Sequence, residues 1–225
     1  MAHHQPPEMQ PSTPWVDQDL PRTEVDYDLP SWAGVVDYYL YGGRNGRNFG
    51  HWVVDKEYGD NILDCFPSER VNALQHRLFL HRAVRYMSGK GVEQFIDLGS
   101  GLAGPYSTHE VVDTLYREEA IKPAARVCYV ENHGYASAST TMLLDQQKRP
   151  RQHAMIEGDL RRPDELLTEI GHEGLINFDD PVGLIVAGTM QLEQRNRQGQ
   201  EVGPAALRHF ADQMAPGSYL ALSHV

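Results

Sequence analysis

Residues 94–110 read QFIDLGSGLAGPYSTHE, and this stretch decides the fold class. A short apolar run is followed by a turn with Gly99, Gly101 and Gly104 in the pattern G-x-G-x-x-G, and then by a polar lead-in to a helix. In a strand–turn–helix context the three glycines allow a tight turn, let a ligand approach bare backbone and bring the helix close to the strand. The stretch therefore favours a turn that binds an adenosine-containing cofactor over a plain turn.

Beyond this turn, short apolar segments alternate with helical patterns. The segments that resemble strands are 126–130, 153–156, 182–187 and 217–222, and the helical patterns between them cover 136–144, 165–170 and 204–214. Alternation of this kind predicts an α/β fold, a Rossmann-like doubly wound and mostly parallel sheet with helices on both faces. A ligand of such a sheet binds across the carboxyl ends of the strands.

Acidic residues stand at three of these strand ends. Asp97 precedes the glycine turn, Glu131 closes the second strand and Asp159 closes the third. We predict that Glu131 accepts hydrogen bonds from ribose hydroxyls, that Asp159 accepts one from an adenine amino group, and that Asp97 receives an ammonium group or orients the turn. Each acid alone could be a helix N-cap, but their joint placement favours a cofactor site.

The composition limits the class of protein. The chain has 225 residues, 40% of them hydrophobic, and a formal net charge of -11, which predicts one globular domain and argues against a nucleic-acid backbone as partner. We find no apolar run of membrane-spanning length and no signal-peptide block, so we expect a soluble, cytoplasmic protein without a membrane partner. Cys65 and Cys128 read as reduced core thiols, and the histidine spacing predicts no metal site.

Three regions follow from these patterns. Residues 1–30 contain six prolines among polar residues and are predicted to be a mostly disordered lead. Residues 31–92 are predicted to form an N-terminal helical lid or cap, and residues 93–225 the Rossmann-like core. Within the cap, Leu80, Val84 and Met87 form the buried side of a helix that begins near Glu69, while Arg77 is assigned to its solvated face.

Candidate substrate and catalytic residues gather before and after the glycine turn. Segment 42–52 is rich in glycine, aromatic and hydrogen-bonding residues, which favours a lid over a site. His109 begins the helix after the turn and is expected to face the mouth of the cleft; the alternative is a surface or capping histidine. Asp37 or His109 is the candidate base and Arg44 the candidate anion holder. The other candidates for the pocket are Tyr38, Tyr39, Asn45, His51 and Gln191.

Several stretches together resemble a known family. They are DYYLYGG at 37–43, FLHRAVRY at 79–86, FIDLGSGL at 95–102, HEV at 109–111, VCYVEN at 127–132, GDLR at 158–161 and PGSYLALSH at 216–224. In this order they are similar to an actinobacterial family of S-adenosylmethionine-dependent methyltransferases of class I fold. The resemblance implies S-adenosylmethionine as cofactor and a place in secondary-metabolite biosynthesis. It puts these residues at cofactor-contacting positions: Asp97, Gly99, Gly101, Glu131 and Asp159.

The sequence also departs from that family. Ala103 and Gly104 stand where the family has Pro-Thr, and Met190 and Gln191 stand where it tends to have a histidine. The sequence stops at Val225, after the fifth strand, whereas a class I methyltransferase continues through two more strands. An open edge strand is an aggregation hazard, so we expect a small partner protein or a second copy to complete the sheet.

Three functions remain open at this point. The first is methyl transfer from S-adenosylmethionine to a small amine-bearing substrate; the acids Glu110 and Asp113 near the helix start disfavour a dinucleotide pyrophosphate in its place. The second is closure of an aziridine ring by displacement of sulfate by an amine, because the chain also resembles methyltransferase-like subunits of azinomycin- and vazabitide-type biosynthesis. The third is a non-catalytic scaffold subunit.

Overall fold

The computed structural model describes residues 28–42, 52–118, 125–147, 152–196 and 198–224. Strands and helices alternate after the glycine turn, as predicted. The strands are β1 (Gln94–Leu98), β2 (Arg126–Glu131), β3 (His153–Glu157), β4 (Gly183–Ala187) and β5 (Tyr219–Ser223). The helices are α1 (Trp32–Tyr41), α2 (Val53–Cys65), α3 (Glu69–Gly89), α4 (Thr108–Glu118), α5 (Gly134–Gln146), α6 (Pro163–Glu173) and α7 (Gly203–Asp212).

The five strands form one parallel sheet in the order β3-β2-β1-β4-β5. The chain winds outward from β1 in one direction and then from β4 in the other, so the direction of winding changes between β1 and β4. Ligands of open α/β sheets bind at such a switch point, outside the carboxyl ends of the strands. The α/β fold class predicted from the alternation of strands and helices is confirmed.

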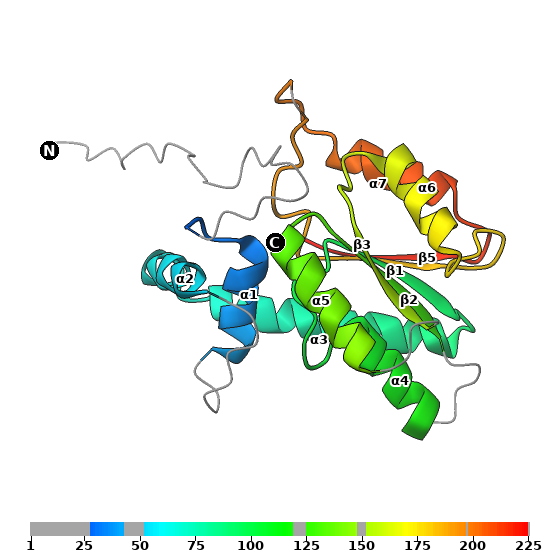
Figure 1. The fold of residues 1–225 in the computed structure, drawn as a ribbon, viewed down its shortest axis with the longest axis horizontal. Coiled ribbons are helices and arrows are strands. Elements are labelled where there is room, and N and C mark those ends of the chain that lie inside the picture. The colour runs from blue at the N-terminus through cyan, green and yellow to red at the C-terminus, as the bar shows by residue number, and fades with distance from the viewer. Residues whose placement is uncertain (1–27, 43–51, 119–124, 148–151, 197, 225) are drawn as a thin grey trace, which may run out of the picture.

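Helices cover both faces of the sheet (Figure 1). On one face, α3, α4 and α5 bury a cluster that includes Val84, Leu115 and Tyr129. On the other face, α6 and α7 bury a second cluster with Ile170 and Phe210 at its centre. All five residues of β1 are buried, because this strand lies between two others and beneath both helical layers. The apolar character of the strands in the sequence follows from this double cover.

Helices α1 and α2 lie beyond the ends of the strands (Figure 1). Asp55 joins their starts: its carboxylate accepts hydrogen bonds from the backbone N–H of Ser31 at 2.7 Å and of Trp52 at 2.7 Å. Ser31 in turn caps α1 by accepting from the N–H of Gly34. A side chain at Gly34 would collide with Asp55, since a Cβ there would lie 2.1 Å from Oδ2. Glycine at this position therefore permits the close approach of the two helices.

One expectation about this region is corrected. Cys65, predicted to be a core thiol, is exposed at the end of α2, whereas Cys128 is buried in β2 as predicted. Burial raises the pKa of the Cys128 thiol to about 12, which keeps it protonated and unreactive.

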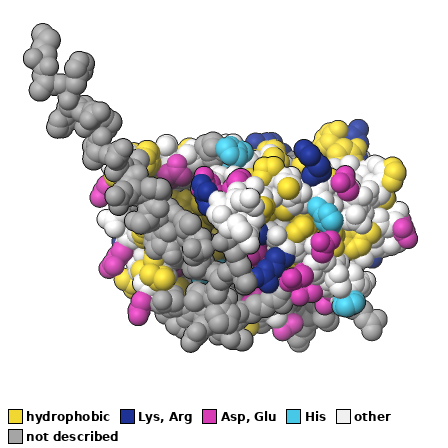
Figure 2. Space-filling model, turned by 90° about the horizontal axis from the view of Figure 1, so that it is seen from above, with side chains coloured by type: hydrophobic (Ala, Val, Ile, Leu, Met, Phe, Trp, Pro, Cys, Tyr) yellow, Lys and Arg dark blue, Asp and Glu magenta, His cyan; other side chains and the backbone are white. Residues whose placement is uncertain are grey.

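The surface of the described part carries both signs of charge. In the face shown in Figure 2, acidic and basic side chains are interspersed with apolar ones over the described residues. Among the described helices, none is long and apolar enough to span a lipid bilayer. β5 lies at one edge of the sheet, and in the described part of the chain it pairs with β4 alone; Leu220 and Leu222 on this strand are exposed.

Candidate functional site

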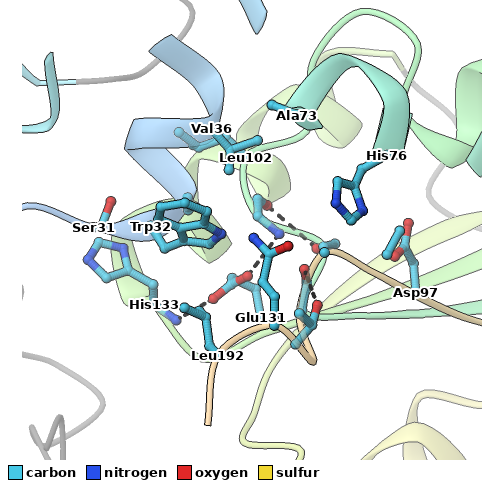
Figure 3. A pocket seen from close by; sticks show the side chains of 18 of the residues that line it. Ser31, Trp32, Val36, Ala73, His76, Asp97, Leu102, Glu131, His133 and Leu192 are labelled. Carbon is cyan, nitrogen blue, oxygen red and sulfur yellow. Dashed lines mark hydrogen bonds between the residues drawn. The ribbon is translucent and has the colours of Figure 1, made fainter. Parts of the chain in front are cut away.

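A cavity of about 430 Å³ opens where the strands end (Figure 3). Its floor is formed by the turns that follow β1, β2, β3 and β4, and its other walls are α1 and one side of α3. The five residues that the resemblance places around a cofactor all line it: Asp97, Gly99, Gly101, Glu131 and Asp159. Cavities of this size hold small molecules in many proteins, so this is the candidate site.

The glycine turn is tied to the end of β2 through Glu131. One carboxylate oxygen, Oε2, accepts a hydrogen bond from the backbone N–H of Gly101 at 2.8 Å, and Oε1 accepts from the N–H groups of Asn132 and His133 at 2.9 Å each. The residue is 7% exposed, and burial raises the pKa of its carboxyl group although the three hydrogen bonds oppose this. Since each oxygen can accept twice, one acceptor position remains, on Oε2.

Asp97 lies at the start of the same turn and is 4% exposed. Its Oδ2 accepts a hydrogen bond from the hydroxyl of Thr108 at 2.6 Å, which joins β1 to the first residue of α4. Burial raises the pKa of Asp97 to about 6, against the effects of Thr108 and Arg77. A cationic group that entered the cavity beside this carboxyl would favour its ionised form.

Asp159 lines the cavity beyond β3, and its carboxylate faces Arg161. The guanidinium group binds both oxygens, with Nη2 2.7 Å from Oδ2 and Nε 3.0 Å from each, while the backbone N–H of Arg161 donates to Oδ1 at 2.9 Å. The prediction that Asp159 accepts from an adenine amino group stays a prediction. An adenine amino group would have to share one carboxylate oxygen with Arg161, because Arg161 already donates to both oxygens.

One side of α3 forms a wall of the cavity. Residues at helical spacing meet there, and they are Glu69, Asn72, Ala73, His76, Arg77 and Leu80. The assignment of Arg77 to a solvated face is therefore wrong. The spacing of arginines along α3 does not indicate which side of the helix faces α1 and the strand ends, so the sequence could not place Arg77. Asn72 donates a hydrogen bond to Glu69 at 2.9 Å, so the polar part of this wall is ordered.

His76 of α3 is one of the histidines that line the cavity (Figure 3). Its Nδ1 lies 2.6 Å from the hydroxyl oxygen of Ser223, at the end of β5, and the same oxygen accepts from the N–H of Gly188 at 2.9 Å. Burial lowers the pKa of His76, while Glu69 raises it. The sequence analysis missed this residue. Its spacing from Glu69 and Asn72 on a predicted helix is the signal that could have found it.

The α1 candidates divide between two sides of the helix. Asp37 is buried and lines the cavity, as does Tyr39. The Tyr39 hydroxyl donates to the carbonyl of Gly59 at 2.9 Å, and burial raises its pKa to about 12, so it is neutral. Tyr38 faces the other way and is not among the cavity residues: its hydroxyl donates to Asp60 on α2. The proposed place of Tyr38 in the pocket is wrong, and its position suits the packing of α1 on α2.

His109 does not face the cleft, contrary to the expectation. It is fully buried under the sheet, where its backbone N–H donates to the Tyr129 hydroxyl at 2.8 Å and its Nδ1 lies 2.7 Å from the same oxygen. Its Nε2 lies 3.1 Å from the amide nitrogen assigned to Gln147. Burial, together with nearby His153, lowers the pKa of His109 to about 4, while Asp113 raises it. The hydrogen bonds to Tyr129 hold the first turn of α4 close to β2, so the His109 side chain points into the core.

The remaining candidates lie at the rim or outside the described residues. Gln191 lines the cavity after β4, as expected, and its Oε1 is buried. Thr189, in the same loop, donates to the carbonyls of Leu98 and Gly99 and so ties this loop to the glycine turn. Arg44, Asn45 and His51 lie outside the described residues.

Comparisons with known proteins agree with this geometry. A family model described as S-adenosyl methyltransferase matches residues 18–225. A crystal structure of a candidate methyltransferase from Thermobifida fusca YX is similar, with 29% identity and a TM-score of 0.69 over 87% of this chain. A DUF574 family protein from Streptomyces avermitilis MA-4680, with 23% identity and a TM-score of 0.67 over 88% of this chain, shares the fold. The chain covers 66% and 69% of their respective lengths. No curated protein matches significantly.

Proposed function

Because the chain belongs to the S-adenosyl methyltransferase family, we propose that it transfers the methyl group of S-adenosylmethionine to a small amine-bearing molecule. The observation that carries this proposal is the cavity at the strand ends, with the Glu131 carboxylate beside the glycine turn. When bound, S-adenosylmethionine supplies an electrophilic methyl group on a cationic sulfur.

The carboxyl groups of the cavity fit the ribose and ammonium groups of that molecule. Glu131 keeps one acceptor position on Oε2 for a ribose hydroxyl. Asp97 presents a buried carboxyl group to an amino acid ammonium group. Both interactions are charge-assisted and involve buried carboxyl groups, so they are stronger than the same interactions on the surface.

The charge of the lining favours a cationic occupant. Among the described residues, six carboxylic acids line the cavity, against two arginines and no lysine. The acids are Asp37, Glu69, Asp97, Glu131, Asp159 and Glu193. Arg161 and Asp159 form an ion pair whose charges cancel, which leaves five acids against Arg77. Such a lining lowers the free energy of a cation and raises that of a phosphate, which supports both the sulfonium and an amine substrate.

The residues of this chain would act by binding and orientation. The α3 wall and Asp37 line the same cavity as the glycine turn, so a substrate bound there lies beside the proposed cofactor positions. Holding two reactants in line is a major source of rate in bimolecular displacement. Asp37, a candidate base in the sequence, is assigned in this proposal to contacts with the substrate, together with Tyr39 and Gln191.

Calorimetric titration with S-adenosylmethionine and S-adenosylhomocysteine tests the function. We expect micromolar binding of both ligands. A folded sample that binds neither would contradict the methyl-transfer proposal and favour the ring-closing or scaffold alternatives. A panel of small amines, incubated with S-adenosylmethionine and analysed by mass spectrometry for a gain of one methyl group, then identifies the acceptor.

We also propose that a strand outside the described residues pairs with β5, from a partner chain or a second copy. The support is the single-sided pairing of β5 in the described part, with Leu220 and Leu222 exposed. Exposed apolar edges are usually covered in native proteins. Light scattering during size-exclusion chromatography measures the mass in solution. A monomer of 25.4 kDa that stays soluble at high concentration would contradict a second copy.

A further inference from the structure

His76 on α3 lies near the ends of β4 and β5. The residues predicted to contact the adenosine lie at the ends of β2 and β3, on the other side of β1. Glu131 belongs to β2 and Asp159 follows β3, whereas His76 contacts Ser223 of β5 and lies close to Gly188 after β4. In the order β3-β2-β1-β4-β5, a molecule with its adenosine over β3 and β2 extends its other end over β1 toward β4. His76 therefore lies on the side of the cavity where the sulfonium would be.

The contacts of His76 leave one ring nitrogen for a ligand. Nδ1 is engaged by the Ser223 hydroxyl at 2.6 Å, and that oxygen also accepts from the Gly188 N–H at 2.9 Å. In the described part of the chain, Nε2 makes no hydrogen bond, and the residue lines the cavity. Gly188 has φ +77, and a Cβ at this position would lie 3.8 Å from Nδ1 of the ring. The imidazole is thus fixed at one nitrogen and open at the other.

The proton state suits a base. Burial lowers the pKa of His76, so the ring is neutral at pH 7, and Glu69 on the same helix opposes this only in part. If Nδ1–H donates to Ser223, the lone pair of Nε2 faces the cavity. A hydroxyl oxygen can accept from both Nδ1–H and the Gly188 N–H, so the observed contacts permit this tautomer.

We infer that His76 is the proton acceptor for the substrate amine in this site, with Ser223 as the residue that positions its ring. The inference rests on the proposed methyl transfer. In the step it assists, a bond forms between the amine nitrogen and the methyl carbon, and the carbon–sulfur bond breaks with its electron pair going to sulfur. The amine proton passes to Nε2, giving an imidazolium that releases the proton to solvent.

A test without the substrate uses the charge on sulfur. S-adenosylmethionine and S-adenosylhomocysteine differ by one methyl group and one positive charge, so a ring beside the sulfur senses the difference. At roughly 6 Å, an added positive charge lowers a histidine pKa by about 0.5 to 2 units. We would titrate protein labelled with ¹⁵N-histidine from pH 5 to 8 in each complex, and assign the His76 signals by their loss in His76→Gln.

The expected results are a lower His76 pKa with S-adenosylmethionine than with S-adenosylhomocysteine, and ¹⁵N shifts of the Nδ1–H tautomer. His81 is the matched control: it is on the same helix and its pKa is also lowered by burial, but its Nε2 contacts the carbonyl of Tyr106 and it is not among the cavity residues. Its pKa should be equal in both complexes. Ser223→Ala should shift His76 toward the Nε2–H tautomer.

Three outcomes overturn the inference, and they are distinguishable. Equal His76 pKa values in two well-formed complexes show that the ring is far from the sulfur, while the cofactor site stands. An Nε2–H tautomer in both complexes shows that the ring nitrogen facing the cavity is a hydrogen-bond donor and cannot accept the amine proton. Failure of both ligands to bind removes the proposed function itself, and the role of His76 with it.

Discussion

Glu131 closes the glycine turn from the neighbouring strand, since its Oε2 accepts a hydrogen bond of 2.8 Å from the backbone N–H of Gly101. The same carboxylate also accepts from two N–H groups at the start of α5. One side chain thus orders both turns that would meet the ribose. These three hydrogen bonds hold the two turns in one relative position.

Replacement Glu131→Gln should weaken both the turn and the site. The glutamine has one acceptor oxygen, so at least one of the three backbone donors faces an NH₂ group and loses its partner. We expect a loss of about 1–3 kcal/mol in the free energy of unfolding. We also expect at least about a tenfold loss of affinity for S-adenosylhomocysteine, because a charge-assisted hydrogen bond becomes a neutral one. Urea denaturation and calorimetry measure the two effects.

The control for this variant is Glu165→Gln. Glu165 is exposed on the first turn of α6 and pairs with Arg162 at the surface, away from the cavity. It should leave ligand affinity unchanged and alter stability by less than about 0.5 kcal/mol. Equal affinity in Glu131→Gln and the native protein would show that Glu131 serves the turn alone.

Binding of S-adenosylmethionine should depend on pH through Asp97. Burial raises the pKa of this carboxyl to about 6, so it is neutral below pH 6 in the free protein. The ligand's ammonium group favours the ionised form and lowers the pKa in the complex. Affinity should therefore be greatest above pH 6 and fall as the pH drops through 6, by up to about tenfold per pH unit.

Calorimetry at pH 5.0, 6.0 and 7.5 measures this dependence, and Asp97→Asn should flatten it. Methylthioadenosine, which lacks the amino acid group, is the matched ligand and should bind the native protein with little change over the same range. A steep decline for methylthioadenosine as well would assign the effect to another group of the site.

Two glycines of the turn allow a graded test of its geometry. Gly99 and Gly101 have φ +67 and φ +65, so alanine is strained at both. A Cβ at Gly99 would also lie 2.4 Å from the Thr189 hydroxyl oxygen, whereas at Gly101 the nearest atom is 3.8 Å away on Ala33. We expect Gly99→Ala to destabilise the protein more than Gly101→Ala, which should cost about 1–2 kcal/mol.

Gly89→Ala is the reference for this series. It ends α3, has no atom within 4 Å of an added Cβ and lacks a positive φ, so the variant should match or exceed native stability. Thermal unfolding of the three variants gives the ranking. Equal losses at Gly99 and Gly101 would mean that the loop of Thr189 moves aside at little cost.

The stability of the fold should fall in acid through His109. Its pKa in the folded protein is about 4, below the usual 6.5, because burial disfavours the charged ring and His153 adds repulsion. Unfolding therefore takes up a proton below pH 6.5, and the contribution is complete above pH 6.5 and lost as the pH approaches 4. The slope from this group is about 1.4 kcal/mol per pH unit at most.

Urea denaturation at pH 7.5 and 5.0 measures this effect in the native protein and in His109→Gln. The variant keeps a polar side chain toward Tyr129 but has no proton to gain, so its stability should vary less over this range. His209→Gln is the control, since His209 is partly exposed on α7 and contacts Asp164 at the surface. A native pH slope retained in His109→Gln would show that another group of the protein causes it.

The sequence by itself determined the fold class and the acids that meet at the strand ends. Glycines after an apolar strand and acids at three strand ends are local patterns, and parallel strands bring their carboxyl ends to one edge. Asp97, Glu131 and Asp159 therefore had to meet once the strands were recognised, and the structure brings them together.

Only the tertiary structure decided which residues of α3 and α4 reach the cavity. Which face of a helix meets a cavity depends on its packing against distant elements, and a polar side chain gives little periodic signal of this. His109 points to Tyr129 in the core, whereas His76 on α3 reaches Ser223, 147 residues away, and lines the cavity. The glycine turn was readable from 17 consecutive residues, 94–110. The histidine opposite it was not, because its role depends on contacts that only the folded chain creates.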